Sequence, residues 1–526
     1  MDPERIEELR NPTVFPERPE TVEILQTHLS VVCLAGDFAY KFKKAIRLPF
    51  ADFSTLEKRR FFCEEELRLN RRLCHGTYLE VVLLRRDSSG SLHFGAGEEE
   101  VVDYAVRMRR LPADRMLDVL LETDSVTAAD VEGIARRMVS FHVEAERGVE
   151  VLDWGDPGKL HAFALANFEE TLLNAGPDRV FPGPLHTALA NRTRHDFSRH
   201  LPLLRERAVS GHVVDGHGDL HARNICLSDP VAIYDCIEFN PAFRCGDTAT
   251  EHAFLVMDLR FRGHQELAAA YADAVIRGNG DEAMREILPM LVRYRAMVRA
   301  KVAAMAAGES ELSEAEREEA KETAQAYLRV AAVSAVEEDW PWWLIFCGLP
   351  ASGKSSIATS LVKASGGAWS GFSSDLIRKE LAGIAPAESL PEEFYDPAFS
   401  RRTYSELRIR ATAATAASRV VILDANFRSR EERRLARIAA REAGARLAIL
   451  HIETDEAIVI ARLAQRAKDP DCESDADRVV YEKLKSVFVA PDANEGDLLI
   501  PVSGNISPDS AVDGILEGLL VFGLKD

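Results

Sequence analysis

A glycine-rich loop that follows a short apolar run constrains this chain more than any other feature. Residues 342–347 are all apolar, as in a buried strand, and the next eight fit the pattern G-x-x-x-x-G-K-S. The backbone N–H groups of such a loop converge on phosphates at the start of a helix, which the sequence predicts over 355–363. The loop consists of Gly348, Leu349, Pro350, Ala351, Ser352, Gly353, Lys354 and Ser355. The second half of the chain is therefore expected to bind a nucleotide.

Side chains next to this loop are expected to complete the nucleotide site. Lys354 carries a charge that can bridge the outer phosphates, and the hydroxyl of Ser355, with Ser356 beside it, can ligate magnesium. Asp424 ends the apolar run 420–424, where a carboxylate suits magnesium or its water shell. An ordinary strand-end aspartate would give the same pattern. The expected cofactors are ATP and Mg2+.

Two pairs of charged residues further along are candidates for the acceptor site and for a closing lid. Asp375 and Arg378 lie three residues apart on a predicted helix and so share a face, although Asp375 could instead only cap or charge that helix. Arg462 and Arg466 lie four apart on another helix, just before the polar stretch 469–477. A lid that closes on a transferring phosphate needs such charges.

The first half carries a second phosphate-handling pattern, H-G-D-x-x-x-x-N, between two short apolar runs. His217, Asp219 and Asn224 lie in this loop, and the next apolar run ends in Asp235. Phosphoryl transfer requires a carboxylate to accept the proton of the substrate hydroxyl, and an amide and a second carboxylate to hold magnesium. Asp219, Asn224 and Asp235 meet these needs in order. Each of them alone would be as well explained by a polar turn.

Lysines on an otherwise apolar strand add to this pattern. The run 31–34, the turn 35–37 and the run 38–43 predict a hairpin, in which Lys41 and Lys43 share a face. An inward lysine can neutralise the phosphates of ATP, whereas on an edge strand a lysine would only prevent aggregation. The following helix, expected over 53–73, supplies Glu65 and Glu66 as partners for such a lysine.

The first half resembles the aminoglycoside phosphotransferase and choline kinase group, which are relatives of protein kinases. The resemblance covers about residues 25–310 and rests on the H-G-D-x-x-x-x-N loop. It implies a two-lobed fold with Lys41 as the strand lysine and Lys43 as the alternative. Glu66, or in second place Glu65, would be the helix partner of that lysine.

The same resemblance implies the remaining roles in the first half. Residues 104–112, with Met108, would form the strand and hinge that contact adenine. Asp219 would be the catalytic base, and Asn224 and Asp235 the metal ligands. Asp247 would brace the loop, and Glu238 would contact the metal or support its ligands.

The second half, residues 342–526, resembles the zeta-toxin, polynucleotide kinase and gluconate kinase side of the P-loop proteins. The resemblance implies that Asp375 is the base or the contact of the substrate hydroxyl, and that Arg378 contacts the substrate or a phosphate. Arg462 and Arg466 would be the lid arginines.

Together these patterns predict a multidomain α/β chain. Residues 1–338 would form a bilobal, protein-kinase-like α+β domain, with a small lobe over 1–110 and a helical large lobe over 111–338. Residues 342–526 would form a P-loop α/β/α domain with a mainly parallel sheet. A length of 526 residues agrees with several domains, since one hydrophobic core rarely supports so many residues.

Composition narrows the class of protein. The net charge of −20 disfavours a long nucleic-acid groove, and no apolar run is long enough for a membrane span. The first residues lack the pattern of a signal peptide, which predicts a cytoplasmic protein. The eight cysteines show no C-x-x-C spacing, so neither zinc nor a disulfide framework is expected.

The expected function is that of a bifunctional ATP-dependent phosphotransferase acting on small hydroxylated molecules. One alternative is a nucleic-acid 5'-hydroxyl kinase or repair factor, which predicts a basic groove around Arg428, Arg430, Arg433 and Arg434. Another is a single catalytic kinase domain regulated by a nucleotide-binding P-loop domain.

Overall fold

The computed structural model describes residues 3–48, 50–176, 179–386, 388, 390–466 and 478–525, without the side chains of Glu392 and Arg466. The polar stretch 469–477, expected to form a lid, and Cys472 lie outside these residues. Contacts between residues divide the chain into two compact units. The first comprises Met1–Ala162, His200–Leu259 and Glu266–Leu291, and the second Phe163–Arg199, Arg260–Gln265 and Val292–Asp526.

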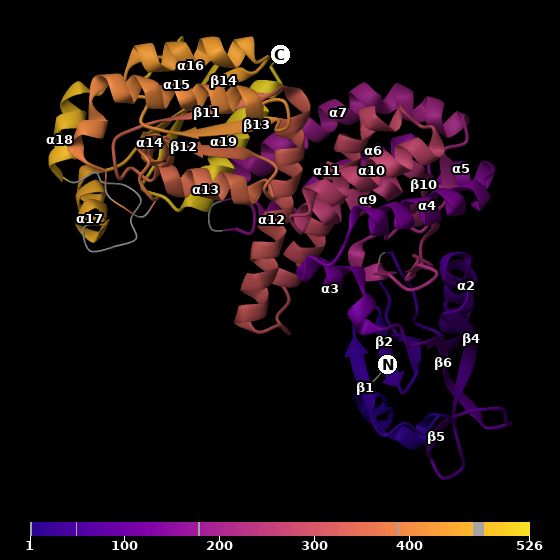
Figure 1. Cartoon of the computed structure of the whole chain (residues 1–526). Helices are drawn as coiled ribbons and strands as arrows, with labels where there is room; N and C mark the ends of the chain where they lie inside the picture. Colours follow the sequence, from indigo (N-terminus) through magenta and orange to yellow (C-terminus); the bar gives the residue numbers. More distant parts are fainter. Residues whose placement is uncertain are drawn as a thin grey trace. The chain divides into compact units, whose positions relative to one another are not determined.

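The first unit begins with a short helix, α1 (Pro3–Glu8), and an antiparallel sheet in the order β1-β2-β3-β6-β4-β5. Helix α2 (Leu56–Cys74), capped by Thr55, packs on β4 and β6 (Figure 1). The predicted hairpin is β2 and β3, with Lys41 paired to Val32 and Lys43 to Ser30 in the antiparallel register. The strands are β1 (Val22–Gln26), β2 (Ser30–Ala35), β3 (Phe38–Lys43), β4 (Tyr78–Arg86), β5 (Leu92–Phe94) and β6 (Glu100–Arg109).

The chain between β6 and the second sheet is mainly helical, as expected. Two small antiparallel ladders interrupt it: β7 (Val213–Asp215) with β10 (Cys245–Asp247), and β8 (Ile225–Cys226) with β9 (Ala232–Ile233). The helices are α3 (Leu117–Glu122), α4 (Ala128–Glu144), α5 (Val149–Trp154), α6 (Pro157–Glu170), α7 (Gly183–Val209), α8 (Pro241–Arg244), α9 (Thr248–Phe261), α10 (Gln265–Asn279), α11 (Met284–Ala307) and α12 (Glu314–Asp339).

The second unit is built on a parallel sheet in the order β12-β13-β11-β14-β15. Its strands are β11 (Trp342–Cys347), β12 (Ser370–Ser373), β13 (Val420–Asp424), β14 (Arg446–Glu453) and β15 (Leu498–Ser503). The helices that connect and cover them are α13 (Lys354–Ala364), α14 (Ser374–Ala382), α15 (Pro397–Ala414), α16 (Arg430–Glu442), α17 (Glu456–Arg466), α18 (Arg478–Val487) and α19 (Pro508–Gly523). In a parallel sheet the carboxyl ends of all strands meet at one edge, where ligands bind.

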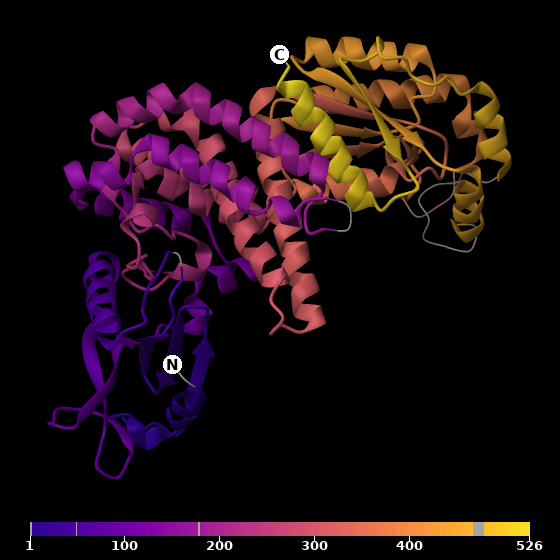
Figure 2. The ribbon, with the colours of Figure 1, turned by 180° about the vertical axis from the view of Figure 1, so that it is seen from behind.

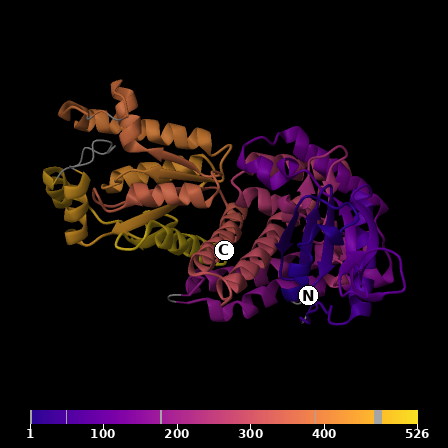
Figure 3. The same ribbon diagram turned by 90° about the horizontal axis from the view of Figure 1, so that it is seen from below.

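Helices cover both faces of this sheet. Helices α15 and α16 lie on one face and α13 and α19 on the other, as Figures 1 and 2 show for the two sides. Figure 3 shows the strands between these helical layers. All six residues of β11 are buried, as expected for a central strand enclosed on both faces.

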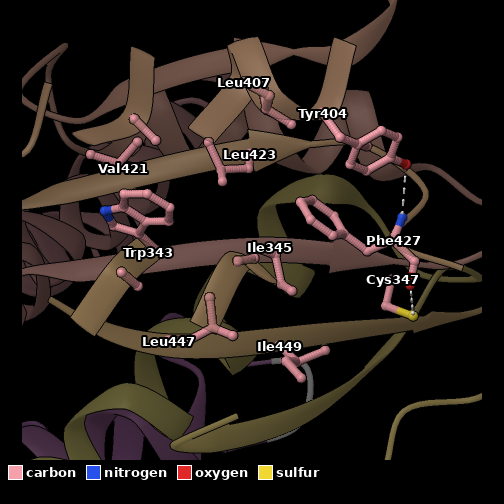
Figure 4. Close-up of a cluster of buried hydrophobic side chains, with 14 of the residues drawn as sticks. Trp343, Ile345, Cys347, Tyr404, Leu407, Val421, Leu423, Phe427, Leu447 and Ile449 are labelled. Atoms are coloured by element: carbon pink, nitrogen blue, oxygen red, sulfur yellow. Dashed lines mark hydrogen bonds between the residues drawn. The ribbon is translucent and has the colours of Figure 1, made fainter. Parts of the chain in front are cut away.

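The core beneath α15 and α16 fixes the start of the glycine-rich loop (Figure 4). Trp343, Ile345 and Cys347 of β11 pack there with residues of β13, β14 and α15. The Tyr404 hydroxyl accepts a hydrogen bond from the backbone N–H of Phe427, 3.3 Å away, directly after β13. Cys347 Sγ, at the end of β11, lies 3.4 Å from the backbone oxygen of Phe427, so the ends of β11 and β13 are held next to each other.

Helix α12 packs against the parallel-sheet part of the second unit. Its Arg329 donates to both carboxylate oxygens of Asp513 on α19, at 2.8 and 3.0 Å. The indole N–H of Trp369 donates to Glu337 at 3.1 Å. A fragment that began at residue 342 would lose these contacts, so experiments on either site are best made on the full chain.

The expected fold class is confirmed: an α+β unit with an antiparallel sheet is followed by an α/β/α unit with a parallel P-loop sheet. The seven cysteines within the described residues are free and buried. No helix in the described ranges is both long and apolar enough to cross a membrane.

Candidate functional sites

The H-G-D-x-x-x-x-N segment of the first unit, residues 217–224, lies in the loop that connects β7 to β8 and is called the catalytic-type loop below. The side-chain amide of Asn224 donates to the backbone carbonyl of Asp219 at 3.0 Å and to its carboxylate Oδ2 at 3.1 Å. The Asp219 side chain is 31% exposed, so a substrate hydroxyl can reach it. The structure therefore brings together the predicted base and one predicted metal ligand.

A buried glutamate that the sequence analysis did not single out supports this loop. Glu251 Oε1 accepts hydrogen bonds from the backbone N–H groups of His217 and Gly218, at 2.5 and 2.6 Å. Its Oε2 lies 2.5 Å from Nε2 of the buried His142. Burial alone would raise the pKa of Glu251, but the hydrogen bond and charge of His142 outweigh it and lower the pKa to about 2. Glu251 is thus an ionised support for the loop.

Asp247, for which the resemblance implied this supporting role, has different contacts. Both of its carboxylate oxygens accept hydrogen bonds from Arg207 on α7, each at 2.8 Å. Oδ1 also accepts the backbone N–H of Ala249 at the start of α9. The backbone N–H groups of His217 and Gly218 are held instead by Glu251, which lies on α9.

Both strand lysines point at helix α2 and share one carboxylate. Lys41 Nζ lies 2.8 Å from Glu66 Oε1, and Lys43 Nζ lies 2.6 Å from Glu66 Oε2. Lys41 also contacts Asp235, and Lys43 also contacts Glu238. Burial alone would raise the pKa of Glu66, but the two ammonium groups outweigh it and lower the pKa to about 2.

The alternative partner, Glu65, points elsewhere. Its carboxylate accepts hydrogen bonds from Arg68 on the same helix, at 2.8 to 3.2 Å. Of the two glutamates that the sequence left open, the structure places Glu66 beside the lysines.

Asp235 combines an unusual backbone with an accessible carboxylate. Its φ of +64° is left-handed, a conformation that few residues other than glycine adopt without cost. Its side chain is 41% exposed, in contrast to the buried Glu66. Strained backbone of this kind is concentrated at functional sites, which favours a ligand-binding role for Asp235.

The predicted hinge lies at the end of β6. Met108 is buried in an apolar cluster with Ala39 and Val106 of the sheet, and with Cys226 and Ala232 of the β8–β9 ladder. Side chains from the sheet and from the large lobe therefore meet at this point. An apolar wall of this kind suits an adenine ring.

In the second unit the glycine-rich loop joins the end of β11 to helix α13. Ala351 and Gly353 have left-handed φ values of +59° and +101°. A Cβ at Gly348 would lie 2.9 Å from the backbone oxygen of Ile452, so only glycine fits there. Lys354 begins α13, and its Nζ donates to the backbone oxygen of Leu349 at 2.7 Å across the loop.

The predicted metal and acceptor residues of this unit lie on neighbouring strand ends. Asp424 ends β13, in register with Ser373 at the end of β12. Ser373 is the N-cap of α14, and its side chain accepts the backbone N–H of Leu376. Asp375 is therefore not the cap of this helix, and its half-buried side chain lies in the first helical turn, just beyond the strand edge.

Arg378 does not extend from the surface of α14. Its side chain is buried, and NH1 donates to the backbone oxygen of Phe394 at 2.9 Å and to Ser400 Oγ at 3.3 Å. The guanidinium also lies 5.0 Å from the centre of the Tyr395 ring. These contacts tie α14 to the segment that leads into α15.

Arg462, expected to belong to a lid, contacts the glycine-rich loop itself. Its NH1 donates to the backbone oxygen of Ala351 at 3.4 Å, and its NH2 to that of Gly504 at 2.9 Å. The side chain of Arg466 lies outside the described part of the chain.

Of the four arginines expected to line a nucleic-acid groove, Arg433 is engaged within the protein, whereas Arg430 and Arg434 are exposed. Arg433 is fully buried and donates to Glu495 at 2.6 Å and to the backbone oxygens of Phe427 and Val489. Arg434 pairs with Glu431 on the same helix. Arg433 therefore cannot belong to a surface groove.

We expect Arg433→Met to lower the free energy of unfolding by about 3 to 5 kcal/mol, because it removes the buried guanidinium that pairs with Glu495 and donates to two backbone carbonyl groups. Arg434→Met removes an exposed arginine from the same helix and should leave stability unchanged. Urea denaturation of both variants measures the difference. Equal stabilities would contradict the structural role of Arg433.

The residues of both sites suit magnesium. No three His, Cys, Asp or Glu side chains cluster as a metal site within the described ranges. Magnesium, however, is usually held by one or two protein oxygens together with substrate phosphates and water. Asp235 with Asn224, and Ser355 with Asp424, offer such oxygens. The ion would supply positive charge that stabilises a transferring phosphoryl group.

Fold and site together define a P-loop nucleotide-binding domain, preceded by a unit in which an antiparallel sheet is followed by helices. A family model described as an AAA domain matches residues 344–491, which confirms the predicted P-loop domain. Uncharacterized proteins of Mycobacterium tuberculosis (strain H37Rv) and Mycobacterium bovis are each 28% identical to the chain over 451 residues, covering 85% of this chain and 86% of the relative.

Solved structures show weaker likeness. A gluconokinase from Sinorhizobium meliloti 1021 is 18% identical, with a TM-score of 0.26, and the match covers 35% of this chain and 95% of that structure. A choline/ethanolamine kinase family protein from Mesorhizobium loti is 13% identical, with a TM-score of 0.35. The match covers 62% of this chain and 98% of that structure.

Proposed function

We propose that the chain is a bifunctional ATP-dependent phosphotransferase. Each unit transfers the γ-phosphate of ATP to a hydroxyl group of a small molecule. One linked set of contacts in the first unit carries the proposal. Asn224 donates to Asp219 within the loop, and its backbone carbonyl oxygen accepts the backbone N–H of Tyr234. The next residue, Asp235, contacts the buried Lys41–Glu66 pair. Phosphoryl transfer needs these groups together, and a turn that was only structural would not need a buried lysine.

In the first unit, Asp219 accepts the proton of the attacking hydroxyl, and Lys41 neutralises the phosphates. Asn224 and Asp235 provide the oxygens for magnesium. Met108 and its apolar neighbours enclose the adenine ring. Glu251 keeps the loop in its conformation through the two backbone N–H groups that it binds.

In the second unit, the loop N–H groups and Lys354 bind the phosphates at the start of α13. Ser355 and Asp424 provide oxygens for magnesium. Asp375 orients or deprotonates the acceptor hydroxyl from the first turn of α14. The position of this helix, directly after the strand end that pairs with Asp424, supports the assignment.

The proposal is tested on the full chain with a metabolite extract and ATP. Mass spectrometry should detect metabolites that gain one phosphoryl group, in two sets. One set should disappear with Asp219→Asn and the other with Lys354→Ala. A chain that phosphorylates no metabolite but labels RNA or DNA would support the nucleic-acid kinase instead.

Asp375→Asn should lower turnover at the second site by about 100-fold or more while leaving ATP binding unchanged, because a lost base acts on the acceptor only. Its melting temperature should stay close to that of the parent, since Ser373 caps the helix. Ser373→Ala is the matched control and should cost about 1 kcal/mol of stability. Normal turnover in Asp375→Asn would rule out the acceptor-site role.

A further inference from the structure

Five charged side chains form a continuous chain in the first unit. Glu66 lies at its centre, with Lys41 Nζ at 2.8 Å from one carboxylate oxygen and Lys43 Nζ at 2.6 Å from the other. Lys41 contacts Asp235 at one end, and Lys43 contacts Glu238 at the other. A single lysine would be enough to pair with Glu66, so the second pair calls for a function of its own.

The two ends of this chain differ in their access to solvent. The Asp235 side chain is 41% exposed and that of Lys41 13%, whereas those of Lys43 and Glu238 are 2% and 5% exposed. The ring of Phe53 lies 5.5 Å from Lys43 Nζ and covers it further. A ligand can therefore reach the pair of Lys41 and Asp235, but not the pair of Lys43 and Glu238.

The proposed reaction requires Lys41 to change partners. Its ammonium group contacts Asp235, the same carboxylate that is proposed to hold magnesium. When ATP is bound, that ammonium group has to face the phosphates. Glu66 is fully buried, and a buried carboxylate that loses its cation is strongly destabilised. A second cation on Glu66 removes this difficulty.

We infer that Lys43 and Glu238 are positioning residues: together they hold Glu66 and helix α2 in place, so that Lys41 can turn from Asp235 and Glu66 to the phosphates of ATP. This inference rests on the function proposed for the first unit. It assigns the phosphate contact to Lys41 and a support role to Lys43. Because Glu238 follows Asp235 by three residues, the same pair also ties the segment that bears Asp235 to strand β3.

The first test compares Lys41→Met with Lys43→Met by hydrogen–deuterium exchange of the full chain without nucleotide. Lys43→Met leaves the buried Glu238 without its cation, so exchange in α2 and in 236–244 should be faster by about tenfold or more. Lys41→Met leaves Glu66 paired with Lys43 and exposes only Asp235 to water. Its exchange should stay close to that of the parent.

A double variant separates positioning from folding. Lys43→Met/Glu238→Gln removes both charges of the buried pair. Hydrogen–deuterium exchange in α2 and in 236–244 should therefore return close to that of the parent chain. In this variant Lys41 alone holds Glu66. Lys41 is then no longer free to leave Glu66. The dissociation constant of MgATP should therefore rise by roughly tenfold even though the fold is intact.

MgATP binding is measured by calorimetry in chains that also carry Lys354→Ala, which removes the second nucleotide site. Lys41→Met should weaken binding most. If Lys41→Met loosens α2 as much as Lys43→Met does, or if the double variant binds MgATP like its parent, the positioning role is wrong. If the Lys354→Ala chain binds no MgATP, the proposed function fails, while the exchange comparison still decides which lysine holds Glu66.

Discussion

Asp219→Asn should lower phosphoryl transfer at the first site by on the order of 100- to 10,000-fold, the usual effect of removing a general base. Asparagine keeps the size of the side chain and can still accept a hydrogen bond from Asn224. It cannot accept a proton from the substrate hydroxyl. ATP binding should remain nearly unchanged, because Asp219 is proposed to act on the acceptor. Initial rates with a metabolite identified in the extract, together with calorimetry of MgATP, measure both effects.

Asp153→Asn is a suitable control for this variant. The Asp153 side chain lies on α5, is 72% exposed and pairs with Lys159, so the variant removes only an exposed carboxylate. Rates with this control should equal those of the parent chain. Unchanged turnover in Asp219→Asn would remove the kinase assignment from the first unit.

Lys354→Ala should weaken nucleotide binding at the second site by on the order of 100-fold or more, because the loop N–H groups cannot replace a full positive charge next to the outer phosphates. The variant also loses the contact of Nζ with the backbone oxygen of Leu349, which spans the loop. Lys363→Ala, at the exposed end of the same helix, is the matched control and should bind nucleotide normally. Titration with a fluorescent ADP analogue measures the nucleotide affinity of the Lys354→Ala and Lys363→Ala chains.

The effect of Lys354→Ala on phosphorylation by the first unit shows whether the P-loop domain is an independent kinase or a regulator of the first unit. Two independent kinases would leave phosphorylation by the first unit unchanged. Loss of both activities would support a P-loop domain that regulates the first unit through its nucleotide. The Asp219→Asn and Lys354→Ala variants should therefore be assayed against both sets of metabolites.

Local patterns in the sequence were enough to predict most elements that carry these sites. The apolar run 342–347 and the run 420–424 coincide with β11 and β13, and the expected hairpin of the first sheet is β2 and β3. Alternation of side chains along a strand also placed Lys41 and Lys43 on one face. Predictions of this kind succeed because they depend on backbone geometry over a few residues.

The partners of charged side chains could not be predicted in this way. Glu251 lies 34 residues after His217, and its function as the support of the catalytic-type loop appears only once α9 is folded against that loop. Arg433 belongs to a run of arginines that suggested a surface groove. Its side chain is buried, however, and donates a hydrogen bond to Glu495, 62 residues away. In each case a contact distant in sequence satisfies a charge that local patterns cannot assign.

The sequence by itself therefore determined the H-G-D-x-x-x-x-N loop and the glycine-rich loop, the strands and helices beside them, and the fold class. Tertiary structure alone decided that Glu66 rather than Glu65 meets the lysines, and that Lys43 pairs with Glu238. The physical reason is that local conformation follows from the preferences of neighbouring residues, whereas burial of a charge requires a specific partner. Which partner it meets depends on how distant segments pack.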